Sequence, residues 1–339
     1  MSKAIHCRHY HLPCRRMRAG ASLMAFFILA FTATTHAQQL PGRSPFATNS
    51  FMWNPAMTSP EPLEWEVGAT HQQEWVGFES SPQTTTIYGQ YPVPKQNFSF
   101  GGYLSLDEIE PLRNNVLGLT YAYKLGFGSR RSRRRRKRAR TRKDAQLSIG
   151  LQLAMQQTFV DGANYITLHP DDPLQPVGEF SVIVPNVGAG LYFASRPSGP
   201  DNKSYFFVGA GTNQILPQDV TFREELPTGN LRRAFHANGT VGYRAQNNSL
   251  IIEPSLWINT AGNVVNVQAN IHVEMERQFW GALAYALNQT ANVQLGYILP
   301  SGIVDGDAIR IGLQGSFNVG GFGGARGLGY GFYLAYRAR

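Results

Sequence analysis

Residues Val265 to Glu276 read VNVQANIHVEME, and apolar and polar residues alternate at every step of this stretch. Successive side chains of an extended chain point to opposite faces, so such a stretch has one apolar and one polar face. The polar face would carry Asn266, Gln268, Asn270, His272, Glu274 and Glu276. Ordinary strands have about 5 or 6 residues. This stretch therefore predicts an unusually long strand that separates an apolar environment from water.

Four further stretches alternate in the same way: 115–126, 145–156, 308–320 and 328–339. Weaker candidates lie between them, at 63–77, 84–93, 97–106, 182–194, 204–215, 231–244, 250–261, 278–288 and 290–299. Together they make fourteen predicted strands, an even number, joined in the second half by tight connections such as NNS, TAG and NQT. Each is long enough to cross a membrane as a tilted strand of about 9 to 11 residues.

The fold expected is an all-β, transmembrane antiparallel barrel of about fourteen strands. A closed barrel leaves no backbone group unpaired in hydrocarbon, whereas an isolated sheet does. The polar faces carry mostly Gly, Ser, Asn and Gln, with few of the charges that coat a soluble sheet. A soluble sandwich or propeller also alternates and is the weaker alternative. After the N-terminus there is neither a helical period nor an apolar run of about 20 residues, which excludes helical spans.

The N-terminal residues have the composition of a secretory signal peptide. A basic leader with Lys3 and Arg8 precedes the apolar run ASLMAFFILAF, and small residues follow at the end of TTHA. We expect a signal peptide at 1–37, a pre-barrel segment at 38–62 and the outer-membrane barrel at 63–339; an uncleaved membrane anchor is the weaker alternative. Both cysteines, Cys7 and Cys14, lie in the leader, so the mature chain has no disulfide.

The positive charge of the chain is local. Five of the 31 basic residues lie in the leader, which leaves 26 against 22 acidic residues, a net charge of +4. Eleven of those 26 lie in one stretch, RRSRRRRKRARTRK, at 130–143, and without it the net charge is −7. This stretch connects the fourth and fifth predicted strands, and its charge predicts a solvated loop. It could dock an acidic partner or be a low-complexity insertion without one; nucleic acid is not an expected partner behind a signal peptide.

The strand count also predicts an orientation. If the N-terminus of the barrel is periplasmic, the loops after odd-numbered strands face outside. The long connections 158–181 and 216–230 then lie outside, as is typical of outer-membrane barrels, and the Arg-rich loop is periplasmic. Aromatic residues predicted to form girdles at the two membrane interfaces are Trp65, Trp75, Tyr88, Tyr121, Tyr123, Tyr192, Phe193, Trp257, Trp280, Tyr297 and Tyr336.

The beginning of the mature chain carries more specific motifs. FMWNPAMTSP is followed by HQQEWVGFESSPQTTTIYGQ and FSFGGYLSLDEIEPLRNNVLGLTYAYKL. These segments resemble the PorP/SprF family of outer-membrane proteins of the type IX secretion system of Bacteroidota. The matching positions are Asn54, Pro55, Ala56, Gln73, Trp75, Val76, Gly77, Phe78, Pro82, Thr84, Asp107, Ile109, Pro111, Arg113, Tyr121, Ala122 and Tyr123. The match covers residues 51–126, with a weaker echo at 185–195, and Glu74 departs from it as an insertion.

The resemblance implies a non-enzymatic part in type IX secretion. Members support the export or surface attachment of proteins with C-terminal sorting domains, and some serve gliding motility. The implied location is the outer membrane, and the implied partners are its lipid, periplasmic secretion components and exported surface proteins. The alternative function is a passive porin or a FadL-like small-molecule transporter.

Candidate partner-binding residues lie on the first two hairpins and in the Arg-rich loop: Trp75, Phe78, Pro82, Asp107, Pro111, Arg113, Arg133, Arg134, Arg135 and Arg136. Exposed aromatic residues supply large contact areas at interfaces, although Trp75 and Phe78 could equally be interfacial anchors. Polar residues expected to face the lumen are Asn266, Gln268, Asn270, His272, Glu274, Arg310 and Gln314. The pattern leaves open whether this lumen is open or plugged.

No catalytic or cofactor motif is present. GGFGGARG at 320–327 lacks the Gly-Lys-Ser/Thr ending of a phosphate loop, and there is no Gly-x-Ser-x-Gly. The mature histidines, His71, His169, His236 and His272, show no metal-ligand spacing. We therefore expect no enzyme, no cofactor and no metal site.

Overall fold

The structure is a computed structural model of the chain. The residues that it describes are 47–60, 65–78, 80–93, 95–127, 145–162, 178–195, 204–215, 219–221, 230–232, 234–247, 249–262, 264–275, 278–288, 290–302, 307–319 and 327–338. The predicted signal peptide at 1–37, the Arg-rich stretch at 130–143 and His169 lie outside these residues.

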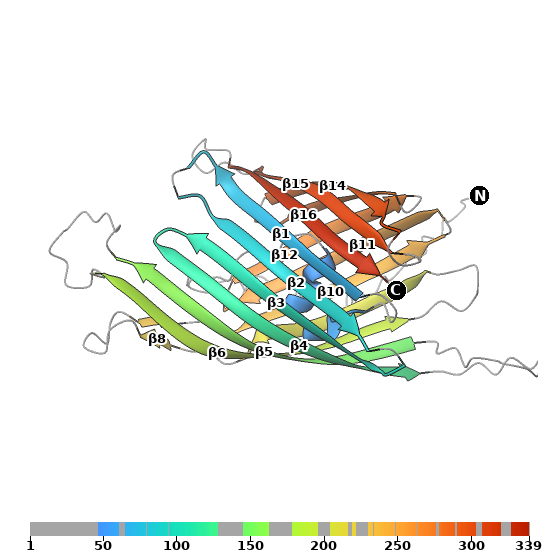
Figure 1. Ribbon diagram of the computed structural model, residues 1–339, viewed down its shortest axis with the longest axis horizontal. Helices are drawn as coiled ribbons and strands as arrows, with labels where there is room; N and C mark the ends of the chain where they lie inside the picture. The colour runs from blue at the N-terminus through green and yellow to red at the C-terminus, as the bar shows by residue number, and fades with distance from the viewer. Residues whose placement is uncertain are drawn as a thin grey trace, which may run out of the picture. The chain divides into compact units, whose positions relative to one another are not determined.

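Fourteen antiparallel strands form a closed barrel, which confirms the predicted fold (Figure 1). The strands are β1 (Trp65–Val76), β2 (Gln83–Pro92), β3 (Phe98–Ile109), β4 (Leu112–Phe127), β5 (Ala145–Asp161), β6 (Glu179–Ser195), β7 (Tyr205–Gln214), β10 (His236–Gln246), β11 (Leu250–Ala261), β12 (Val264–Met275), β13 (Phe279–Ala286), β14 (Thr290–Pro300), β15 (Ala308–Asn318) and β16 (Leu328–Ala338). Each strand pairs with its neighbour in the chain order, and β1 pairs with β16 to close the ring. Closure satisfies the backbone groups at both sheet edges.

The outer face of the barrel is apolar, as the alternation predicts. On β12, Val265, Ile271 and Met275 are 45%, 40% and 51% exposed, whereas Gln268 between them is buried. Leu119 of β4 and Leu295 of β14 are among the most exposed leucines of the same face. Large apolar side chains cover a continuous outer band in this way, and polar side chains line the lumen. This arrangement suits a barrel with lipid outside.

The two ends of the barrel differ. We call the end where β1 begins and β16 ends the proximal rim; there Trp65 pairs with Ala338. The opposite end, which carries the β1–β2 and β3–β4 hairpins, is the distal rim. Because β4 ends and β5 begins at the proximal rim, where Phe127 pairs with Ala145, the Arg-rich connection starts and finishes there.

The predicted strand at 231–244 is wrong at its beginning. Its barrel part starts at His236, as β10. The preceding residues form β9 (Asn230–Arg232), which pairs with β8 (Asp219–Thr221) in a separate two-stranded sheet between β7 and β10.

Four residues predicted for the interfacial girdles point into the lumen instead. Tyr88, Tyr192, Trp257 and Trp280 are all at most 6% exposed. Each follows or precedes an outward apolar neighbour, as Tyr88 follows Ile87, so the two-residue period of a strand turns it inward.

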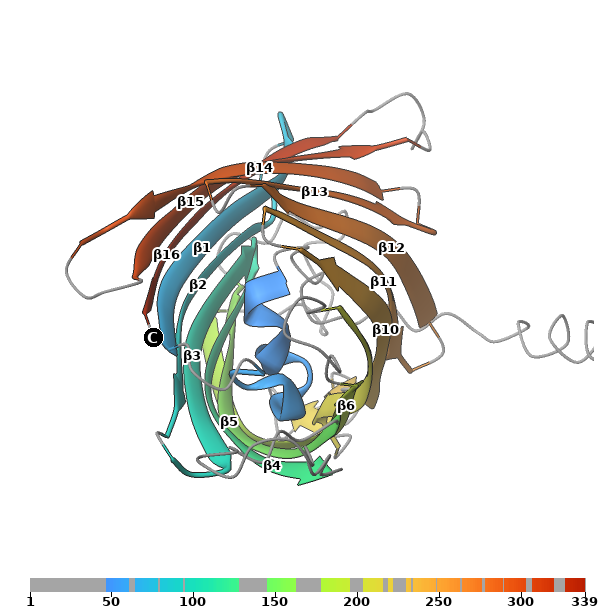
Figure 2. The same ribbon diagram turned by 90° about the vertical axis from the view of Figure 1, so that its right-hand side faces the viewer.

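Two short 3-10 helices, η1 (Ala47–Met52) and η2 (Pro55–Met57), precede the barrel strands. They lie inside the ring of strands (Figure 2). The described part of the predicted pre-barrel segment is thus enclosed by the barrel. Among the described residues no helix is both long enough and apolar enough to cross a membrane.

Candidate functional site

The site is the lumen, and the segment 47–60, which we call the plug, fills its middle. Asn54 organises the plug: its Oδ1 accepts a hydrogen bond from the backbone N–H of Ala56 at 3.0 Å, an N-terminal cap of η2. Its Nδ2 donates to the backbone carbonyl of Leu191 on β6 at 3.1 Å. One fully buried amide therefore both shapes the plug and ties it to the barrel wall.

Glycines on three neighbouring strands make room for the plug. A Cβ at Gly150 of β5 would overlap the backbone of Pro55 and Ala56. A Cβ at Gly190 of β6 would overlap the Asn54 side chain, and one at Gly211 of β7 would lie 2.8 Å from its Cγ. The plug therefore occupies a slot that only glycine leaves open at these three places.

Further hydrogen bonds attach the end of the plug to β3 and β4. Thr58 donates to Thr120 at 2.9 Å, and the Thr58 carbonyl accepts from Ser99 at 2.7 Å. The carbonyl of Ser59 accepts from the ammonium group of Lys124. Thr58 and Ser99 are fully buried and have no contact with solvent. These hydrogen bonds therefore satisfy polar groups that water does not reach.

Other contacts hold the plug to β2 and β10. The Ser59 backbone N–H donates to Gln90 Oε1 at 2.6 Å, and Asn238 Nδ2 donates to the Trp53 carbonyl at 2.8 Å. The Phe51 ring packs against Tyr88 and Tyr103, with ring centroids 6.0 and 6.1 Å apart. Strands on opposite sides of the ring, β2 and β10, are thus attached to the same segment.

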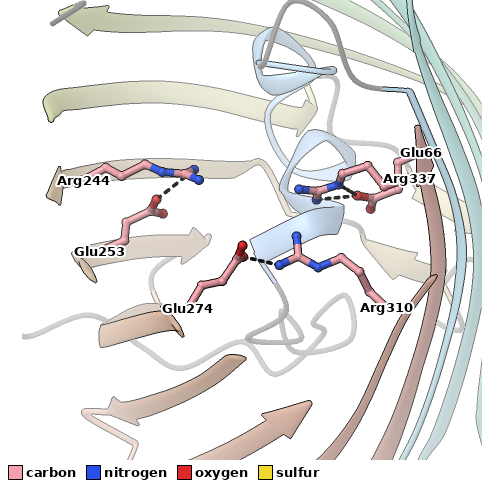
Figure 3. A network of polar contacts seen from close by, with 6 residues as sticks. All are labelled: Glu66, Arg244, Glu253, Glu274, Arg310 and Arg337. Atoms are coloured by element: carbon pink, nitrogen blue, oxygen red, sulfur yellow. Dashed lines mark hydrogen bonds and ion pairs between the residues drawn. The ribbon is translucent and has the colours of Figure 1, made fainter. Parts of the chain in front are cut away.

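Three ion pairs line the lumen near the proximal rim (Figure 3). Arg337 of β16 donates through Nε to Glu66 of β1 at 2.6 Å. Arg310 of β15 pairs with Glu274 of β12, which is three strands away in the ring. Arg244 of β10 and Glu253 of β11 are 3.5 Å apart. Three guanidinium groups are therefore balanced by three carboxylates.

A cavity of about 180 Å³ lies among these ion pairs and next to Ser59 and Pro60 of the plug. His272 and Trp280 also line it, with ring centroids 6.1 Å apart. Arg310 and Glu274 join strands that share no backbone hydrogen bonds, whereas the other two pairs join neighbouring strands. They therefore brace the proximal mouth of the lumen and keep its wall polar.

Most of the predicted lumen residues take part in polar contacts inside the barrel. His272, Glu274 and Arg310 line the proximal cavity. Gln268 donates to Asn270 at 2.5 Å, and Gln314 donates to Asn292 at 3.3 Å and accepts from Gln294 at 3.2 Å. Asn266 is half-buried, and its buried Oδ1 has no hydrogen-bond partner.

The predicted partner-binding residues separate into two groups. Trp75 and Phe78 are 49% and 53% exposed at the distal rim, where Phe78 lies in the β1–β2 connection. Arg113 lies on the outer face of β4, 2.7 Å from Glu108 and over the ring of Phe159. These three side chains are accessible.

Asp107, Pro82 and Pro111 have structural contacts. Asp107 faces the lumen, is 5% exposed and accepts a hydrogen bond from Thr84 at 2.7 Å, so it is not part of an outer docking surface. The carbonyls of Pro82 and Pro111 accept from the backbone N–H groups of Glu74 and Asp161. Arg133, Arg134, Arg135 and Arg136 lie outside the described residues.

Sequence reasoning missed the plug and its slot. The Asn-Pro-Ala motif at 54–56 was visible, but its partner Leu191 is 137 residues away. The sequence pattern does not distinguish the glycines of the slot from other glycines on the polar face of a barrel. Among the described residues no group of three or more His, Cys, Asp and Glu side chains could hold a metal. The arrangement holds a hydrogen-bonded segment inside a polar lumen.

A family model described as "Type IX secretion system membrane protein PorP/SprF" matches residues 35–336. No curated protein sequence matches the chain. Similar solved structures include the monoaromatic hydrocarbon channel CymD, with a TM-score of 0.49 and 9% identity over 88% of this chain and 94% of that one. The toluene transporters TbuX of Ralstonia pickettii (TM-score 0.49, 12% identity, 86% and 93% covered) and TodX of Pseudomonas putida (0.47, 11%, 89% and 99%) are similar to the same degree. At these scores the structural likeness carries no argument about function.

Proposed function

Because this chain belongs to the PorP/SprF family of type IX secretion system membrane proteins, we propose that it is a non-enzymatic outer-membrane component of that system. It supports the export or surface attachment of proteins with C-terminal sorting domains, and gliding motility where the cell glides. The barrel acts as an anchor in the outer membrane. Its two rims contact different partners.

The observation that carries this proposal is the plugged lumen. Asn54 is 0% exposed and hydrogen-bonded on both sides of its amide, and the glycine slot fits the segment around it. A passive porin needs a continuous aqueous path, and a small-molecule transporter needs a route for its substrate. A segment attached inside the lumen obstructs both kinds of path, and it therefore favours a scaffold that works through its rims over either of these alternatives.

The proposed orientation places the proximal rim in the periplasm. The Arg-rich connection at 130–143 then faces periplasmic secretion components and offers eleven positive charges to an acidic partner. At the distal rim, Trp75 and Phe78 offer exposed aromatic surface to exported proteins. The proximal rim thus offers positive charge to its partner, and the distal rim offers aromatic surface.

Affinity purification from outer membranes tests the proposal. The tagged chain is crosslinked in cells, extracted in mild detergent and purified, and the proteins bound to it are identified. We expect both periplasmic secretion components and sorting-domain proteins. A Trp75→Ala/Phe78→Ala variant should lose the sorting-domain proteins and keep the periplasmic ones, while removal of 130–143 should do the reverse.

The matched control is Leu119→Ala/Leu295→Ala, which changes exposed apolar residues of the lipid-facing band. This control should recover both classes of partner. If the unaltered chain recovers neither class and conducts ions in planar bilayers, the anchor proposal is wrong and a porin is the better description.

A further inference from the structure

A groove with a volume of about 670 Å³ lies on the outer face of the barrel. It crosses β13, β14, β15, β16, β1 and β2, which are consecutive neighbours in the ring (Figure 2). Its lining is almost entirely apolar, and no residue of the plug, of the three lumen ion pairs or of the predicted partner-binding set belongs to it. The groove is therefore a feature of the wall that the proposed function does not use.

The groove runs between two rows of outward side chains that the strand register places side by side. The first row consists of Phe279, Tyr297, Ile311, Leu334 and Ala69. The second row consists of Leu295, Leu313, Phe332, His71 and Thr85. Between these rows lie the paired residues Gly296, Gly312, Tyr333 and Thr70. Because the period of a strand turns this middle row toward the lumen, its backbone forms the floor of the groove.

The two ends of the groove differ in chemistry. It begins at the proximal rim with Phe279, the first residue of β13, whose ring contacts that of Tyr297 edge-on at a centroid distance of 5.0 Å. Aromatic side chains at this depth are typical of a membrane interface. It ends near the middle of β1, where His71 Nδ1 and Thr85 Oγ1 lie 2.8 Å apart, within hydrogen-bond distance. The apolar lining stops at this polar pair.

The length of the groove matches one leaflet of a membrane. Neighbouring strands lie about 4.8 Å apart, so six strands give a length of about 24 Å. Strands of membrane barrels tilt by about 35 to 45°, and a groove at right angles to them rises about 14 to 17 Å along the membrane normal. Half of a hydrocarbon core of about 30 Å is about 15 Å. The groove thus reaches from the proximal interface to about the midplane.

The width of the groove suits a single hydrocarbon chain. Outward residues two positions apart on a strand are separated by about 7 Å, which is the spacing of the two rows. An α-helix with its side chains is about 10 to 12 Å across and is too wide to enter. Leu295 and Leu313, which are 68% and 61% exposed, form one side wall, and the short Ala69 leaves space opposite them.

We infer that this groove binds one acyl chain of a phospholipid from the leaflet on the proximal side. The headgroup lies at the proximal rim beside Phe279 and Tyr297, and the chain follows the backbone floor and ends at the polar pair of His71 and Thr85. Lipid tails are as apolar as leucine, so the chain is held by close packing against the two rows rather than by removal from water. The barrel therefore retains this lipid more tightly than the lipids around the rest of its outer face.

Native mass spectrometry tests the site. The chain is purified in detergent, freed of lipid and titrated with dipalmitoyl phosphatidylethanolamine, and the bound lipids are counted. We expect one lipid per barrel to remain under activation that removes the others. Ala69→Phe places a ring in the groove and should weaken this binding at least about tenfold, because it displaces part of the chain from its packing contacts.

The matched control is Val67→Phe. It makes a ring of the same size on the same outward face of β1, two residues closer to the proximal rim, where Val67 is 50% exposed and does not line the groove. This variant should bind the lipid as the unaltered chain does. Folding of each variant is checked by the heat-dependent migration of the barrel on a gel.

A second comparison tests the far end of the groove. Because the polar pair stops the apolar lining, the unaltered chain should bind distearoyl phosphatidylethanolamine no more tightly than the dipalmitoyl lipid. His71→Leu/Thr85→Val replaces the pair with apolar side chains and should make the barrel prefer the longer lipid.

Three results would overturn the inference. One is that the unaltered chain retains no lipid once detergent is removed in the spectrometer. Another is equal retention by Ala69→Phe and Val67→Phe. The last comes from a photo-crosslinking amino acid placed at position 313 in cells: an adduct with phospholipid is expected, and an adduct with a protein instead would show that a partner covers this face.

Discussion

The plug makes a quantitative prediction about conduction. Asn54→Ala removes the acceptor for the buried Ala56 N–H and the donor to the Leu191 carbonyl. An unsatisfied buried donor costs about 1 to 3 kcal/mol, and a lost hydrogen bond about 0.5 to 1.5 kcal/mol. The plug should therefore be held about 2 to 4 kcal/mol less tightly. Since about 1.4 kcal/mol is a factor of ten, the fraction of barrels with a displaced plug should rise roughly 30- to 700-fold.

Single-channel recording in planar bilayers measures this fraction directly. The unaltered chain should be silent or open rarely, and Asn54→Ala should show openings far more often. Gly150→Val should act in the same direction by a different cause, because its side chain would overlap the backbone of Pro55 and Ala56. The matched control is Asn292→Ala, which removes another buried lumen amide that bonds Gln314 and not the plug.

Two outcomes would refute the reasoning. If the unaltered chain conducts continuously, the segment 47–60 does not close the lumen. If Asn54→Ala and Asn292→Ala fold and remain equally silent, the amide of Asn54 does not hold the plug in place.

Three further predictions concern the wall and the proximal rim. Ile271→Arg should reduce the folded, membrane-inserted fraction, because arginine on the lipid face near the bilayer midplane costs about 2 to 4 kcal/mol. Asn270→Arg, on the lumen face, should insert nearly normally. Equal insertion of the two variants would contradict the assignment of faces. Arg310→Met should lower the free energy of unfolding in urea by about 3 to 5 kcal/mol, because Glu274 is left as an unpaired, largely buried charge. The double variant Arg310→Met/Glu274→Met should recover most of this loss. A double variant as unstable as the single one would show that the two residues are not coupled. After removal of 130–143, Gly128, Ser129 and Asp144 would form a three-residue hairpin loop between the paired residues Phe127 and Ala145. The thermal stability of the barrel should therefore be unchanged. A large loss of stability would show that the stretch supports the barrel.

The sequence predicted the wall of the barrel well. The strand period is a local property: Val265 to Met275 alternates because each residue faces either lipid or the lumen, and neighbours in sequence show this directly. The same period could have placed Tyr88 and Trp257 inside, since their apolar neighbours Ile87 and Ile258 point outward. The girdle prediction was wrong for these two residues because it was based on residue type and not on the position of each residue in the strand period.

The start of β10 was missed for a related reason. Residues 231–232 are extended, and extension alone cannot tell a barrel strand from the short β8–β9 sheet. Strand pairing depends on which segment lies alongside, and the alternating pattern of one segment does not identify its pairing partner.

By itself, then, the sequence determined the fold class, the number of barrel strands, and the faces of the strongly alternating segments. The tertiary structure alone decided that the lumen is plugged and which polar groups meet inside it. Asn54 reaches Leu191 across 137 residues, and Arg310 reaches Glu274 across three strands of the ring. Side-chain direction along a strand follows from local geometry, whereas contacts across a lumen exist only once the ring has closed and brought distant strands to face one another.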